Sequence, residues 1–69
     1  MHIVYSHHAK QRMRQRAVTE LEVAHIMRHH KYLIKSHGDT RIVVGELNSR
    51  TIHVVFVHKE KYINIVTVR

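Results

Sequence analysis

The sequence predicts an α+β fold, in which two helices pack on one face of an antiparallel sheet. Residues 7–16 contain no glycine, proline or β-branched residue and are rich in strong helix formers. A complete helix-start pattern follows at Thr19. From residue 32 onward, short runs of β-branched and aromatic residues alternate with turn residues, which is typical of strands joined by hairpins.

The first structured element is expected to be a brief strand at residues 3–5, Ile-Val-Tyr, because all three residues favour strands. This run stops at Ser6, whose hydroxyl can cap the first amides of a helix. We therefore expect a helix over residues 7–16. At 3.6 residues per turn, its apolar stripe is narrow and consists of Ala9, Met13 and Ala17.

A second helix is expected to begin at Thr19. Thr19 and Glu22 have the spacing of a capping box, and Val18 can contact Val23 across the helix start. Acidic residues lie in the first turn and basic residues in the last, the order that the helix dipole favours. Two short helices with narrow apolar faces cannot cover each other, so both must dock on a larger layer.

That layer is predicted to be a four-stranded antiparallel meander, because short connections separate the apolar runs. The third run has apolar residues on both faces, which indicates a central strand. Gly45 inside the second run indicates a bulge or a close approach of another backbone. Nothing in the sequence suggests a linker, so residues 1–69 form one domain. The four runs are residues 32–36, 40–47, 51–59 and 62–68.

The composition indicates a partner rich in negative charge. Twelve Lys and Arg against five Asp and Glu give a formal charge of +7. RNA or an acidic protein would complement this charge. The chain has no cysteine, no apolar run of the roughly 20 residues that span a membrane, and a short polar N-terminus unlike a signal peptide. We therefore expect a cytoplasmic protein, a monomer or a homodimer, that binds neither membranes nor a cofactor.

The candidate site is a column on the first helix. His8, Arg12 and Arg16 are four residues apart, so they stack on one face of the helix, beside the apolar stripe. Metal-independent RNA cleavage needs a proton acceptor, a proton donor and cations around the phosphate. His8 can act as acid or base, and the two arginines can bind phosphate oxygens in bidentate fashion.

A second acid or base would have to come from the sheet, where His53, His58 and Tyr62 are the candidates. Further phosphate contacts are expected from four basic residues, Lys10, Arg14, Arg41 and Arg69. The alternative is a structural role, in which the column covers the sheet or pairs with acidic residues and Lys10 and Arg14 are merely solvated.

Nine histidines also raise the question of a metal site. His25 and His29 are four apart on the second helix, with Glu22 near them, and this spacing can bind a divalent ion. All three project away from the expected apolar face, and no His-Glu-x-x-His pattern is present. The sequence therefore predicts no metal centre.

The stretch Tyr5-Ser6-x-His8-Ala9-x-x-Arg12-Met13-x-x-Arg16 resembles a bacterial family of uncharacterised small domains marked by HAxxRMxxR. That family in turn is similar to the RelE and BrnT ribonuclease toxins. The resemblance implies a RelE-like arrangement of two helices on a curved antiparallel sheet, RNA cleavage and an antitoxin partner. Ala17 departs from the pattern, since glycine is expected after the second arginine of the motif.

Three functional hypotheses follow. The first is a RelE/BrnT-like, metal-independent ribonuclease or RNA-binding domain, with His8 as acid or base and Arg12, Arg16 and Arg41 as phosphate clamps. The second is a non-catalytic interaction domain, in which the column locks the first helix to the sheet or binds an acidic partner. The third is sequence-independent nucleic-acid binding through the basic helix.

Overall fold

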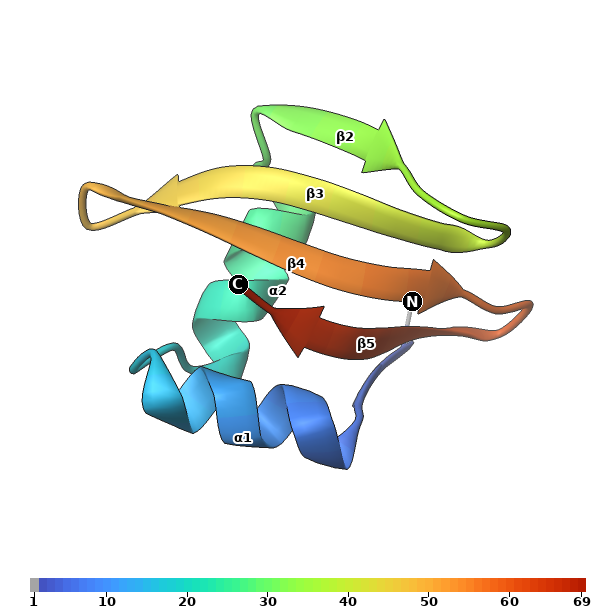
Figure 1. The fold of residues 1–69 in the computed structure, drawn as a ribbon, viewed down its shortest axis with the longest axis horizontal. Coiled ribbons are helices and arrows are strands. Elements are labelled where there is room, and N and C mark those ends of the chain that lie inside the picture. The colour runs from blue at the N-terminus through green and yellow to red at the C-terminus, as the bar shows by residue number, and fades with distance from the viewer. Residues whose placement is uncertain (1) are drawn as a thin grey trace.

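The computed structural model describes residues 2–69 and confirms the α+β class (Figure 1). It contains two helices and five strands. Every predicted element is present, and its ends agree with the prediction to within one or two residues. The elements, in chain order, are β1 His2–Tyr5, α1 His7–Gln15, α2 Glu20–Arg28, β2 Tyr32–Lys35, β3 Thr40–Leu47, β4 Arg50–His58 and β5 Tyr62–Val68.

The predicted four-stranded antiparallel meander is wrong, because the sheet has five strands and is mixed. The strand order is β1-β5-β4-β3-β2, and β1 pairs with β5 in parallel. Ile3 and Tyr5 lie beside Ile63 and Ile65, and all four pack in or against the core. β1 thus gains burial by joining the sheet at its far edge. The other three pairs are antiparallel, and β4 is the central strand, as predicted.

Both helices lie on the same face of the sheet (Figure 1). α1 packs against β5, and α2 packs against β3 and β4. The buried apolar residues of the helices and of the sheet form one core, and hydrophobic burial is its main stabilising term. The members of this core are Ala9, Met13, Val18, Val23, Ile26, Val43, Ile52, Val54, Phe56, Ile65 and Val68.

Gly45 lies under α2, against the side chain of Ile26. A Cβ at this position would lie 3.0 Å from Cγ2 of the fully buried Ile26. The close neighbour is a side chain, not the second backbone that the sequence indicated. The bulge in the sheet is elsewhere, between Val55 and Phe56 of β4, where the register with β5 shifts.

The caps of both helices were predicted correctly. The Ser6 hydroxyl accepts a hydrogen bond from the Ala9 amide at 3.0 Å. The Thr19 hydroxyl accepts from the Glu22 amide at 3.1 Å, while the Thr19 amide donates to the Glu22 carboxylate at 2.8 Å. Each bond satisfies an amide that has no partner inside the helix. The Ser6 hydroxyl also donates to the carbonyl of Val66 at 3.0 Å, so the start of α1 is tied to β5.

α1 ends in a Schellman motif that contains alanine where glycine is usual. The Val18 amide donates to the Met13 carbonyl at 2.8 Å, and the Ala17 amide donates to the Arg14 carbonyl at 3.3 Å. Ala17 has a φ of 55°, in the left-handed region. Alanine in place of the expected glycine therefore leaves the link between the helices intact, in a conformation that costs an L residue about 1–2 kcal/mol.

Tyr5 links β1 to α2. Its hydroxyl donates a hydrogen bond to the Glu20 carbonyl at 3.2 Å. Burial, and after it the nearby Glu20 carboxylate, raise the pKa of Tyr5 above its ordinary value of 10.0, because both disfavour the phenolate. This hydrogen bond fastens the start of α2 to the edge strand β1.

Candidate nucleic-acid interface

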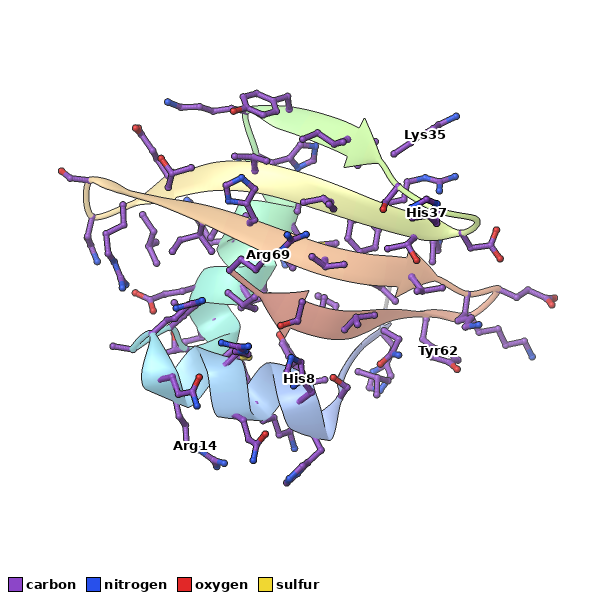
Figure 2. The ribbon with its side chains drawn as sticks, in the orientation of Figure 1. His8, Arg14, Lys35, His37, Tyr62 and Arg69 are labelled. Atoms are coloured by element: carbon purple, nitrogen blue, oxygen red, sulfur yellow. The ribbon has the colours of Figure 1, made fainter. Side chains whose placement is uncertain are left out.

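The column of His8, Arg12 and Arg16 lies on α1, beside the helix face that packs on β5. Ala9 and Met13 enter the core, and the neighbouring column residues are less covered: His8 is exposed, and Arg12 and Arg16 are half-buried. One helical turn rises about 5.4 Å, so Arg12 lies roughly one turn from each of its two neighbours in the column. Figure 2 shows His8 on the side of α1 nearer β5, and Arg14 on the opposite side, pointing away from the sheet.

Arg16 fastens the end of α1 to the last strand. Its Nε donates a hydrogen bond to the Val68 carbonyl at 3.3 Å. This bond uses only one of the five guanidinium N–H groups, so the remaining four stay available to an oxyanion. Arg16 therefore has a structural role and a free binding capacity at the same time.

Arg50, the first residue of β4, binds the end of the same helix. Its Nη1 donates to the carbonyl of Arg16 at 2.6 Å, and its Nη2 lies 3.5 Å from the carbonyl of Ala17. Carbonyls at a helix C-terminus have no partner inside the helix and carry partial negative charge, so a guanidinium there is favourable. A residue from the sheet thus caps α1.

These two arginines and Arg69 surround an open cavity of about 580 Å³. It lies where the end of α1, the start of β4 and the end of β5 meet. Its lining includes three arginines and no Asp or Glu, and the guanidinium of Arg16 can bind phosphate oxygens in a bidentate manner. The lining residues are Gln15, Arg16, Ala17, Arg50, Thr51, Ile52 and Arg69.

The structure brings His53 next to Arg69, but on the other face of the sheet from α1. The backbones of His53 and Arg69 exchange two hydrogen bonds of 2.8 and 2.7 Å, so their side chains point to the same face. Ile52 and Val54, the neighbours of His53, face the helices. Because side chains alternate along a strand, His53 faces away from α1 and from His8.

The remaining predicted site residues lie elsewhere. Tyr62 begins β5, at the opposite end of that strand from Arg69, and it is apart from His8 in Figure 2. His58 is exposed at the end of β4. Arg41 is directly opposite Lys35 in the sheet, six residues from the end of β3 that approaches the cavity. Lys10 and Arg14 are exposed on α1.

The histidine pair considered as a metal site is present on α2. The rings of His25 and His29 are 4.9 Å apart and tilted by 39°. Glu22 is occupied by the capping box of the same helix. Across residues 2–69, no three His, Asp or Glu side chains are grouped so that they could hold a metal ion.

Arg50 was missed by the sequence reasoning, which began this strand one residue later. The Asn48-Ser49 turn before it is the sequence feature that could have indicated where the strand begins. Asn48 and Ser49 have φ values of 51° and 67°, so they form a two-residue turn with both central residues left-handed. Such a turn pairs the residues on either side, Leu47 with Arg50. The hairpin therefore places an arginine at the end of the sheet.

The chain belongs to a family described as Domain of unknown function (DUF4258), which matches residues 5–69. The matched region includes the whole HAxxRMxxR stretch and all of the cavity. No curated protein and no solved structure matched the chain. Within residues 2–69, neither of the two helices, each of nine residues, is long and apolar enough to cross a membrane.

Proposed function

We propose that this protein is a toxin-type domain, similar to RelE and BrnT, that binds RNA in the cytoplasm through the phosphate groups. The observation that carries the proposal is the cavity lined by three arginines and no Asp or Glu, at the end of the His8-Arg12-Arg16 column. The guanidinium of Arg16 belongs to both the column and the cavity. A phosphate backbone bound in the cavity can therefore continue along α1 toward Arg12 and His8.

Charge supports RNA over a neutral ligand. The whole chain carries +7, and each arginine that neutralises a phosphate releases a counterion. The open form of the cavity suits a polymer that passes through it. The half-buried positions of Arg12 and Arg16 restrict their side chains, which lowers the entropy that binding must remove.

The proposal extends from binding to a cleavage step at His8. Its neutral imidazole would accept the proton of a ribose 2′-hydroxyl while the 2′-oxygen bonds to phosphorus and the bond from phosphorus to the 5′-oxygen breaks; water would give that oxygen its proton. Arg12, one turn away, would stabilise the anionic phosphorane. His8 is exposed and so accessible to RNA.

The binding proposal is tested with a fluorescent single-stranded RNA in the presence of a chelator, over a series of salt concentrations. Replacing Arg12 or Arg16 by Gln should weaken binding and reduce the slope of log affinity against log salt by roughly 0.7 for each phosphate that is no longer neutralised. Arg14→Gln is the matched control, because it removes the same charge from the outer side of α1. If all three variants weaken binding equally, only net charge matters and the proposed interface is wrong.

Cleavage is tested separately in the same chelated buffer. His8→Gln should retain RNA affinity and lose cleavage, because Gln keeps a hydrogen-bonding side chain but cannot exchange a proton near neutral pH. Cleavage that persists in this variant would show that His8 has no catalytic role, and would leave the binding proposal untouched.

A second candidate is a structural interaction module. It is favoured by one observation: Arg16 and Arg50 bond to main-chain carbonyls and so hold α1 to the sheet. On this hypothesis the column seals the core, so Arg12→Gln would lower the melting temperature and the wild type would not bind RNA. Thermal melts of the same variants distinguish the two functions.

A further inference from the structure

The edge strand β2 exposes an apolar surface that nothing in the described chain covers. Its four residues are all exposed, and Tyr32, Leu33 and Ile34 keep 55%, 49% and 43% of their surface accessible. In Figure 1 this strand forms one edge of the sheet, with β3 as its neighbour. Proteins usually protect an exposed apolar edge, because its unpaired main-chain groups can bind another strand.

The free edge has a defined set of main-chain hydrogen-bonding groups. The Ser36 amide donates to the Thr40 carbonyl at 3.0 Å, so this position faces β3. Main-chain groups alternate in direction along a strand. The amides and carbonyls of Ile34 therefore face β3, whereas those of Leu33 and Lys35 face outward. An added strand would bond to these two residues.

The charges around β2 are unbalanced. Lys35 is directly opposite Arg41 in the β2–β3 register, and like charges in that position repel. Within residues 2–69 the ion pair found is Lys31 with Glu46, at 3.2 Å, so neither Lys35 nor Arg41 has a carboxylate partner there. Residues 28–41 contain four Lys and Arg and a single Asp. A carboxylate from outside would relieve this repulsion.

We propose that β2 binds an extended acidic polypeptide segment, which adds a sixth strand to the sheet. Its main chain would bond to Leu33 and Lys35, its apolar residues would cover Tyr32 and Ile34, and a carboxylate would pair with Lys35. This is the strand-addition mode of peptide recognition, in which main-chain bonds supply affinity and alternate side chains supply specificity.

A second copy of the chain fits this edge less well. An antiparallel pair of β2 strands centred on Leu33 places Lys31 of each copy opposite Lys35 of the other. Two such like-charge pairs would oppose the association. RNA fits less well too, because three adjacent apolar side chains and outward main-chain groups favour a peptide over a phosphate backbone.

The test uses the full chain labelled with ¹⁵N and a synthetic peptide of alternating Glu and Val, eight residues long and blocked at both ends. We expect the peptide to shift the amide resonances of Leu33 and Lys35 and to slow their hydrogen exchange. Lys35→Glu should weaken peptide binding about fivefold to tenfold, because it removes an attraction and adds a repulsion. Lys10→Glu, the same change on α1, is the matched control and should bind as the wild type does.

Leu33→Pro provides a second variant. Proline is tolerated on an edge strand where its missing amide would face solvent, so the fold should persist while peptide binding is lost. Three results would overturn the proposal: the peptide leaves the Leu33 and Lys35 amides unchanged, a short RNA shifts them while the peptide does not, or the chain alone is a dimer in which they are already protected. Equal loss of binding in Lys10→Glu would also overturn it.

Discussion

Replacing Ala17 by Gly should stabilise this protein, although it removes a methyl group. Ala17 has a φ of 55° at the end of α1, where the Schellman motif requires a left-handed residue. An L side chain in this conformation costs about 1–2 kcal/mol, which glycine avoids. Glycine also increases the conformational entropy of the unfolded chain, which opposes the gain by about 0.4–1 kcal/mol. The net increase in the free energy of unfolding should be about 0.5–1 kcal/mol.

The assay is urea denaturation, with thermal melting as a second measurement. For a domain of this size, the expected gain corresponds to a rise in melting temperature of about 2–8 °C. Ala24→Gly in α2 is the matched control, because the same substitution inside a right-handed helix should lower stability by about 1 kcal/mol. If Ala17→Gly lowers stability as much as Ala24→Gly does, the left-handed conformation of Ala17 does not carry the cost assigned to it.

Two further substitutions test the packing and the pH dependence. Gly45→Ala should lower the free energy of unfolding by about 1–3 kcal/mol, since its Cβ would lie 3.0 Å from Ile26 in a filled core, and an unchanged urea midpoint would contradict the close packing. The raised pKa of Tyr5 means that above about pH 10 the unfolded chain loses this proton first, so wild-type stability falls as pH rises. Tyr5→Phe should lose less stability than the wild type between about pH 8 and pH 11, measured by urea midpoints, and parallel losses would refute this linkage.

The elements with local signals were predictable. Ser6 and Thr19 start the two helices because their hydroxyls bond to amides three residues ahead, within a single turn of the chain. The central position of β4 follows from apolar residues on both of its faces. Gly45 indicated a bulge or a close backbone approach, whereas the structure shows the side chain of Ile26 beside it.

The candidate interface was predictable only in part. The spacing of Arg12 and Arg16 placed them on one face of a helix, because helical periodicity is local. That Arg16 and Arg69 line the same cavity depends on α1 packing along β5, which joins residues more than fifty positions apart. A tight hairpin places Arg50 beside the cavity. Arg41 lies near the other end of β3, away from the cavity.

By itself, the sequence determined the α+β class, the positions of the two helices and five strands, and the helical column, because each depends on contacts between residues close in the chain. Only the tertiary structure decided that β1 joins β5 in parallel and that three arginines line one cavity. A four-residue strand carries too few side chains to indicate its partner, and the gain that selects β5 comes from burying Ile3 and Tyr5 in a core assembled from the whole chain.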